Sequence, residues 1–356
     1  MHEKIKTTYE AVGLPRIIIV SFFLLLLLSA GPLGLSIPSL MSDAIRRWGM
    51  YGVLVLAMVP AVQCGIGLNF GISLGIVSGL VGATLVIELN ITNPWVAILL
   101  AILIAVIIAS IVGVGYGMLL NRVKGSEMTV STYVGFSVIA FMNIMWLTLP
   151  FKDGDLIWPI GQVGMRNTIS LTTSFGEVLS NTPLSVQIGE KAVGLYIPTG
   201  LLLFFFATCF IVYLFMKSKV GLAMSAVGSN PVFARSTGIN VNKMRIIGTA
   251  ASTALGAIGI IIYAQSYGFL QLYNAPLMMG FHCVAAILIG GATISRAKIS
   301  HVIIGTFLFQ GILAVALPVA NAVLPEGNLS DVIRIIISNG IILYALSKTK
   351  GGKDGE

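Results

Sequence analysis

The stretch Ile17–Leu28, read as IIIVSFFLLLLL, decides the fold of this chain. It is almost wholly apolar, and similar runs recur as far as Leu346. The 356 residues are 56% hydrophobic and only 10% charged, whereas a soluble domain carries roughly 25% charged residues. The composition therefore indicates a protein that crosses a membrane several times rather than a globule with a large core.

A helix needs about 20 apolar residues to cross the roughly 30 Å of hydrocarbon in a bilayer. We therefore predict an all-α polytopic membrane protein with about ten transmembrane helices in a single domain, residues 1–356. The first run lacks a clear cleavage site, so we expect a retained span rather than a signal peptide. The expected spans are 17–39, 49–68, 70–88, 95–119, 129–149, 197–216, 246–265, 277–294, 299–323 and 331–347.

The distribution of Lys and Arg predicts the orientation, because cytoplasmic loops carry an excess of both. With the N-terminus inside and ten spans, fifteen of the 21 basic residues are cytoplasmic. Both termini are then cytoplasmic, and the net charge of +8 reflects topology rather than a nucleic-acid partner. The six basic residues expected outside are Arg46, Arg47, Lys152, Arg166, Lys191 and Arg334.

Two polar segments interrupt the apolar pattern. Residues 151–195 form a long external loop, in which 156–163 and 175–179 are candidate short surface helices. Residues 217–245 form a basic cytoplasmic loop.

The second and third spans have an irregular composition. Between Pro60 and Gly82 the chain carries five glycines and several small or amide residues, which make a poor straight helix. Broken backbone at membrane depth survives only where protein buries it or a wet cavity adjoins it. Glycines four residues apart also fit close helix packing, so packing and pathway lining both remain open.

The sequence lacks the motifs of several other classes. It has no G-x-x-x-x-G-K-[ST] nucleotide-binding loop and no HExxH motif, so we predict no enzymatic activity and no metal site. Cys64, Cys209 and Cys283 lie in apolar runs without paired spacing, which is typical of small buried residues. Few ionisable groups lie within spans, which counts against an ion-coupled secondary transporter but leaves neutral uniporters open.

The cytoplasmic loop contains Gly221–Ile239, read as GLAMSAVGSNPVFARSTGI. Gly228 is expected to break a first helical piece, and either Ser229 or Asn230 to cap a second one with Pro231 in its first turn. That helix should cover about 232–237 and stop at Gly238. A short capped helix exposed to the cytosol suits protein docking, although an ordinary basic loop has the same chemistry.

This segment resembles the cytoplasmic loop of ABC-importer permeases of the ribose, simple-sugar and branched-chain amino acid group. Their pattern is roughly G-x-x-x-R-A-V-G-x-N-P-x-A-A-x-x-x-G-I. The stretches GLNFGISLG (67–75) and GGAT (290–293) are similar to two further motifs of the group. Departures at Ser225, Phe233 and Asn69, and at Arg296 and Lys298, suggest a divergent member or one half of a heteromeric pair.

The resemblance implies a multi-pass permease of a bacterial inner membrane, paired with a second permease, identical or homologous. It also implies two cytosolic ABC ATPase subunits and an extracytoplasmic substrate-binding protein. No cofactor is expected in this chain, since ATP and Mg²⁺ belong to the ATPases. The residues implied in ATPase docking are Gly228, Asn230, Pro231, Ala234, Arg235 and Gly238.

A translocation path lined by neutral polar groups would suit a sugar or a nucleoside. The candidates lie in the irregular stretch and in the facing half of the chain. A branched-chain amino acid remains an alternative substrate, and a self-contained secondary transporter or channel an alternative class. The predicted path residues are Gln63, Asn69, Phe70, Ser73, Gln265 and Asn274.

Overall fold

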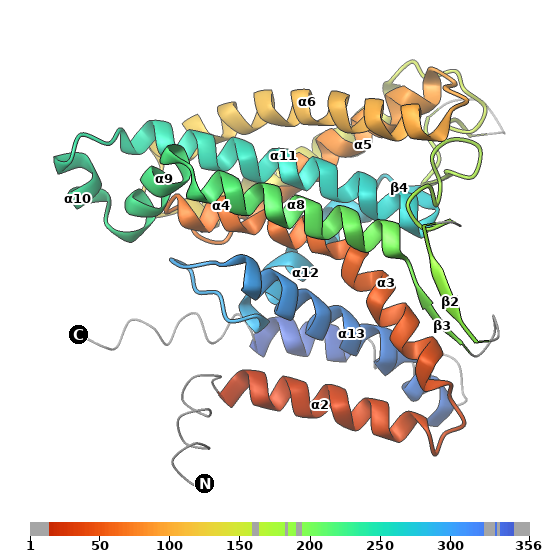
Figure 1. The fold of residues 1–356 in the computed structure, drawn as a ribbon. Helices are drawn as coiled ribbons and strands as arrows, with labels where there is room; N and C mark the ends of the chain where they lie inside the picture. The colour runs from red at the N-terminus through yellow and green to blue at the C-terminus, as the bar shows by residue number, and fades with distance from the viewer. Residues whose placement is uncertain are drawn as a thin grey trace, which may run out of the picture.

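A computed structural model describes residues 14–158, 164–181, 184–189, 194–323, 332 and 335–344. Long helices run roughly parallel and make up most of the molecule (Figure 1). The helices are α2 Leu14–Ala30, α3 Ile37–Leu56, α4 Met58–Gln63, η1 Phe70–Ile72, α5 Ser73–Glu88, α6 Pro94–Arg122, α7 Glu127–Thr148, α8 Thr199–Lys217, α9 Lys219–Ser229, α10 Pro231–Ser236, α11 Val241–Tyr267, α12 Ala275–Ile289 and α13 Ile299–Val323. The strands are β1 Thr168–Ser170, β2 Val186–Ile188, β3 Leu195–Ile197 and β4 Phe269–Gln271.

Within these described ranges, seven helical segments are long and apolar enough to cross a membrane. They are Ile37–Gln63, Phe70–Glu88, Pro94–Arg122, Glu127–Thr148, Thr199–Lys217, Val241–Tyr267 and Ile299–Val323. Three shorter apolar helices, Arg16–Ala30, Ala275–Ile289 and Ile335–Tyr344, lie in the remaining expected spans. The prediction of a helical, multi-pass membrane fold is confirmed at this level.

The predicted boundary between the first two spans is wrong. Helix α2 ends at Ala30, and α3 begins at Ile37 rather than within 49–68. Gly31 and Pro32 interrupt the helix, and Gly34 has a φ of 73°, which favours glycine. The Ser36 side chain then caps α3 by accepting a hydrogen bond from the Ser39 amide, so residues 37–39 belong to the second helix.

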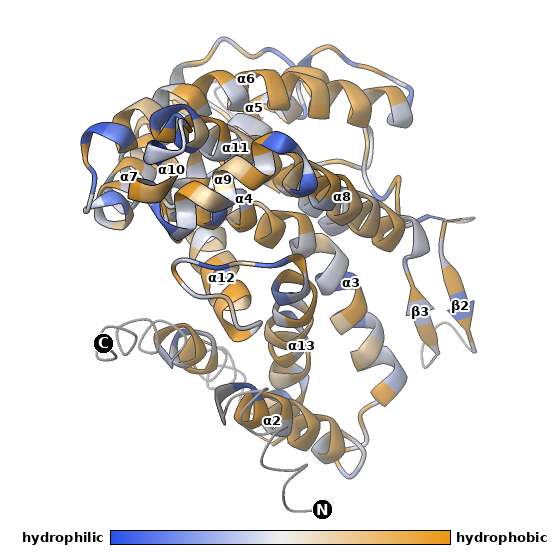
Figure 2. Cartoon of the chain, turned by 60° about the vertical axis from the view of Figure 1, so that its left-hand side comes forward, coloured by the Kyte–Doolittle hydropathy of each residue, from blue (hydrophilic) through white to orange (hydrophobic). Residues whose placement is uncertain are grey.

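Helix α11 is central to the larger group of helices and packs against α3, α5 and α6. Helix α13 packs against α3, α12 and α2. Of the most apolar 18 residues of Phe70–Glu88, which comprises η1 and α5, 83% are buried. The corresponding share for α7 is only 22%. Figure 2 shows predominantly hydrophobic colouring along the long helices. The outer helices α6, α7 and α8 therefore present apolar faces suited to lipid or to another membrane subunit.

The glycines of α5 allow close helix packing. A methyl group at Gly75 would overlap the Thr253 carbonyl oxygen, and one at Gly79 would overlap backbone of Ala257, both in α11. Gly82 makes a similar approach to Ala101 and Ala105 of α6. The packing interpretation of these glycines is therefore confirmed, since only a missing side chain lets the backbones approach so closely.

The polar segment after α7 folds back onto the end of α11. Strand β1 pairs antiparallel with β4, with Thr168 opposite Gln271, and β2 pairs with β3. The expected surface helices are wrong where they are described, because residues 175–179 form turns. Phe175 is fully buried, so this part of the segment packs against the hydrophobic core. Residues 159–163 lie outside the described ranges.

Candidate functional site

The α9–α10 segment lies at one end of the molecule (Figure 1). Helix α9 covers Lys219–Ser229, and the Asn230 side chain caps α10. Its Oδ1 accepts hydrogen bonds from the amides of Val232 at 3.1 Å and Phe233 at 2.9 Å. Gly238 follows with a φ of 84° and ends the motif. The predicted short capped helix is confirmed, with bounds one residue earlier than expected.

Most of the predicted docking residues are accessible, but one is not. Asn230, Pro231, Arg235 and Gly238 are exposed. Ala234 is fully buried in a small cluster with neighbouring apolar residues, so its part is to hold α10 against the rest of the loop.

Two residues that the sequence analysis had not selected dominate the apolar surface of α10. Val232 is 77% exposed and Phe233 is 60% exposed on a helix of only six residues. Large apolar side chains gathered at an exposed tip are typical of a binding surface. The exposed face of Val232, Phe233 and Arg235 is hereafter the docking tip. The departure from the family pattern at Phe233 was the available signal for it.

Gly228 does not break a helix, contrary to expectation; it lies within α9. A methyl group there would overlap the carbonyl of Gln63 and come close to the amide of Gly65. Glycine is needed at this position because α9 lies directly on the chain where α4 ends. Ser225 adds a hydrogen bond to Gln63 Oε1 at 3.1 Å.

Gln63 connects three parts of the molecule. Its Oε1 accepts from Ser225 of α9, and its Nε2 donates to the carbonyl of Ala297 at 2.5 Å. Ala297 belongs to the connection between α12 and α13. Any displacement of α9 therefore acts directly on Gln63 and through it on α4 and on that connection.

The irregular stretch beyond Gln63 is a true break between helices, as predicted. Residues 64–69 are not helical, and both Gly65 and Gly67 have positive φ values of 78° and 89°. Asn69 is fully buried there, donates to Ser252 Oγ at 2.9 Å and accepts from the Tyr116 hydroxyl at 2.9 Å. Its amide is thus paired within the protein and fixes the broken segment to α6 and α11.

The six predicted path residues do not share one cavity. Phe70 and Ser73 adjoin a shallow groove with Leu277 and Phe281 of α12. Ser73 Oγ donates to the Pro276 carbonyl at 2.9 Å, which joins α5 to α12.

The other path residues lie elsewhere. Gln265 is fully buried near the opposite end of α11, where its Oε1 accepts from the Leu179 amide at 3.2 Å. Asn274 is exposed before α12. Gln63 adjoins the groove between α8, α9 and α13.

A buried ion pair near the α9–α10 end also escaped the sequence analysis. Arg245 Nη2 lies 2.5 Å from Glu127 Oε1, and the two side chains are 7% and 15% exposed. The pair joins the N-terminal parts of α11 and α7. In the sequence both residues are charges at the ends of apolar runs. Their separation in the chain gives no indication that they form an ion pair.

A cavity of about 240 Å³ opens at the opposite end of the molecule from α10, between α3 and α11. Helix α3 contributes charged groups and α11 contributes aromatic ones. The residues that matter most are Asp43, Arg46, Arg47, Tyr51, Tyr263 and Tyr267. Arg46 and Arg47 had counted only as topological charges, so their convergence with three tyrosines was not expected from sequence.

Within the described residues, no group of three or more His, Cys, Asp or Glu side chains is placed to hold a metal ion.

The family model of the permease component of branched-chain amino acid transport systems matches residues 40–342. The chain belongs to this family. The match covers the broken segment, α9 and α10, and the cavity between α3 and α11. The family is the permease component of transport systems, and with seven membrane-capable helices among the described residues this permease is a multi-pass membrane protein.

Curated relatives of this permease differ in the solutes in their names. The tyrosine transport system permease protein of Clostridioides difficile is 28% identical over 205 residues, 56% of this chain and 65% of its own. The nucleoside ABC transporter permease protein of Lactococcus lactis is 31% identical over 106 residues, 30% of this chain and 33% of its own. The xylose/arabinose import permease protein of Sulfolobus acidocaldarius is 27% identical over 172 residues, 48% and 47% of the two chains. The permease thus spans between a third and two thirds of these relatives, and no solved structure matches it.

Proposed function

We propose that this chain is the transmembrane subunit of an ATP-driven importer, which forms the translocation path for a sugar or a nucleoside. The observation that carries the proposal is the docking tip, an exposed apolar and basic surface on the capped helix α10; the preceding helix α9 contacts the break between two membrane helices through Gly228. A separate ATPase would bind this tip. The ATPase would hold ATP and Mg²⁺, and this chain would supply the translocation path and the mechanical connection.

The connection runs through named contacts. Phe233 and Val232 would enter an apolar groove of the ATPase, and Arg235 would meet acidic groups at its rim. Movement of the tip would pass through α9, because Gly228 and Ser225 contact Gln63. Gln63 is the last residue of α4 and directly precedes the non-helical residues 64–69. ATP binding can shift the permease only by the difference in ATPase affinity between its two states.

The proposed topology is ten spans with both termini and α10 in the cytoplasm. It is supported by the excess of Lys and Arg in the segments on the α10 side. The segment with β1, β2 and β3 would then be external and would meet a substrate-binding protein. A second permease, identical or homologous, would cover part of the apolar faces of the outer helices.

The substrate proposal is supported by neutral polar chemistry in the membrane part and by relatives named for pentoses and nucleosides. A branched-chain amino acid is the second candidate. Asp43 and Arg47 of the cavity would pair with its ammonium and carboxylate, but a branched aliphatic side chain has no flat ring to stack on the three tyrosines.

The test of the proposal is co-purification. The tagged permease should bring down a P-loop ATPase, and the double variant Asn230→Ala with Arg235→Glu should release it. The reversal Lys152→Glu, on an exposed residue in the segment after α7, is the matched control and should retain the ATPase. A double variant that keeps full ATPase binding and ATP hydrolysis would contradict the docking role. Solute uptake into liposomes without ATP would instead indicate a self-contained transporter or channel.

A further inference from the structure

The cavity between α3 and α11 combines an aromatic floor with charges at its mouth. The Tyr51 and Tyr263 ring centroids are 5.1 Å apart at 67°, and Tyr263 stacks on Tyr267 at 5.4 Å and 18°. Tyr51 and Tyr263 are buried, while Tyr267 is 44% exposed. The three rings therefore form a continuous aromatic surface that leads from the mouth of the cavity to its floor.

The charges at the mouth differ in how they are paired. The Arg46 guanidinium donates to the Ser266 carbonyl and lies 3.4 Å from the Glu177 carboxylate, so Arg46 is already bound within the protein. Asp43 and Arg47 are exposed, and neither forms an ion pair with any residue that the structure describes. They lie four residues apart on α3 and so share one helix face. One acceptor and one donor group are thus open to a ligand.

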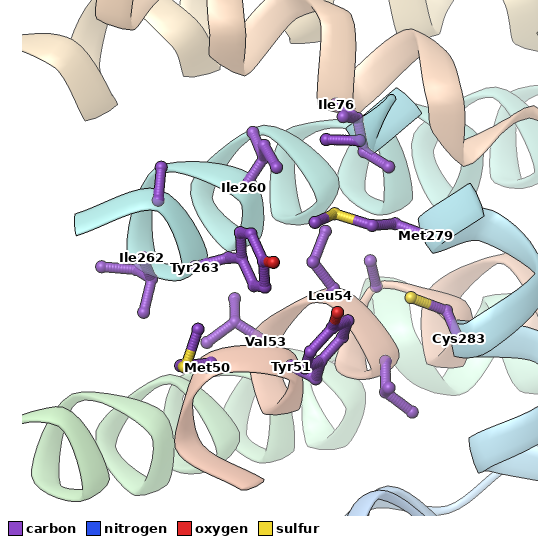
Figure 3. Close-up of a cluster of buried hydrophobic side chains, with 14 of the residues drawn as sticks. Met50, Tyr51, Val53, Leu54, Ile76, Ile260, Ile262, Tyr263, Met279 and Cys283 are labelled. Carbon is purple, nitrogen blue, oxygen red and sulfur yellow. The ribbon is translucent and has the colours of Figure 1, made fainter. Parts of the chain in front are cut away.

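Apolar side chains pack on the inner side of the two buried tyrosines. In Figure 3 the Tyr51 and Tyr263 rings, from α3 and α11, meet edge to face, with Leu54, Met279 and Cys283 beside them. Leu54 and Cys283 are fully buried, and Met279 is 3% exposed. A solute that reaches the tyrosines meets a hydrocarbon layer.

The polar side chain of His282 lies beyond the tyrosines at the floor of the cavity. The His282 ring lies 6.2 Å from Tyr51, and its Nδ1 is buried without a hydrogen-bond partner among the described residues. Buried polar atoms are paired in almost all proteins, so this one points to a water or a ligand group beyond Tyr51, although His282 does not itself line the cavity. This observation is independent of the charges at the mouth.

We propose that this cavity binds the transported solute before it passes the hydrocarbon layer, and that the solute is a nucleoside. The proposal rests on the proposed importer function and narrows its substrate. A planar base would stack on Tyr263 and Tyr267, and its polar edge would accept from Arg47. The ribose hydroxyls would donate to the Asp43 carboxylate, as ribose hydroxyls do to acidic residues in nucleotide sites.

The base distinguishes a nucleoside from a pentose. A pentose alone has no flat aromatic ring and would leave most of the tyrosine surface uncovered. Free tyrosine has a flat ring, a phenol hydroxyl and two charges that would pair with Asp43 and Arg47, so it is the competing occupant and direct binding measurements separate the two. The volume of about 240 Å³ lies below the roughly 300–1,000 Å³ of pockets for drug-sized ligands, which favours a small solute over a nucleotide-sugar or a peptide.

The experiment measures equilibrium binding of tritiated uridine to the purified complex of permease and ATPase, with competition by ribose and by tyrosine. Saturable uridine binding, weakened by about tenfold or more in Arg47→Gln, is expected from the loss of one charge-assisted hydrogen bond. Tyr267→Leu should weaken it as well, and Tyr267→Phe should restore it because stacking is kept. Lys152→Gln, which removes an exposed cation from outside the cavity, should bind as the unmodified complex does.

Three results would overturn the inference. They are uridine binding that the cavity variants leave unchanged, displacement of uridine by ribose as readily as by uridine, and saturable binding of tyrosine in place of uridine. If the complex retains its ATPase but binds no uridine, the cavity assignment fails while the importer function stands. If no ATPase co-purifies with the unmodified permease, the importer function itself fails.

Discussion

At the scale of single residues, glycine and asparagine positions carry the connection between the docking tip and the membrane part. Gly228 is small because Gln63 lies against it, and Asn69 is polar because Tyr116 and Ser252 bond to it. The residue type at each position indicates from sequence that a close or polar contact is needed. The sequence does not indicate the contact partner, because each contact joins segments more than 40 residues apart.

Gly228→Ala should weaken the fold and the coupling together. The added methyl overlaps the backbone at the end of α4, and overpacking of this kind costs about 1–3 kcal/mol. We expect a lower midpoint of thermal unfolding in detergent and lower substrate-stimulated ATP hydrolysis. Gly115→Ala is the matched control, because open space surrounds that helical glycine and alanine favours helix by about 1 kcal/mol. Equal behaviour of the two variants would show that α9 does not rest on Gln63.

Asn69→Ala should destabilise the permease by about 1–3 kcal/mol, since it strands the buried Tyr116 hydroxyl. Adding Tyr116→Phe to Asn69→Ala should recover part of that loss, because the stranded donor disappears. Thermal unfolding of both single variants and the double variant measures the coupling. Strictly additive losses would mean that the two side chains do not share a hydrogen bond.

At the scale of elements, helix ends were predicted better than helix partners. The cap at Asn230 and the break after Gln63 depend on local chemistry, so a short sequence window is sufficient to find them. The turn at 31–36 was missed, because the apolar runs on either side hid its Gly-Pro pair. The pairing of β1 with β4 joins residues about 100 positions apart, and no local signal announces it.

The pair of Arg245 and Glu127 gives a prediction about α7 and α11. Glu127→Gln should destabilise the protein by about 3–5 kcal/mol, because it leaves the Arg245 charge buried and unpaired. Glu127→Gln combined with Arg245→Met should be more stable than Glu127→Gln alone, since both charges are then gone. Thermal unfolding compares them. A double variant no more stable than the single one would show that Arg245 finds another partner.

At the scale of the whole molecule, the apolar periodicity and the basic residues carried most of the prediction. They gave the helical membrane fold and singled out the loop that holds α9 and α10. The candidate cavity could not be read from them, because Arg46 and Arg47 meet Tyr263 and Tyr267 only once α3 and α11 pack together. Counting charges by segment also hides which of them converge.

The proposed topology predicts a labelling pattern. All three cysteines are buried, so the unmodified permease should not react with a membrane-impermeant maleimide. Thr237→Cys, at the exposed end of α10, should react only after cells are opened, whereas Lys152→Cys should react in intact cells. Labelling of Thr237→Cys in intact cells would reverse the orientation.

Helix α11 also connects the two ends of the molecule. Its 27 residues extend over about 40 Å at 1.5 Å per residue. One end follows α10 after only a few residues, and the other continues through Gly268 into β4, which is stitched to β1. A rotation of α11 that follows the docking tip would therefore also move the segment with β1 and β4. In the proposed importer, opening of the outer mouth and engagement of the ATPase would be two ends of that one rotation, with no relay of side chains between them.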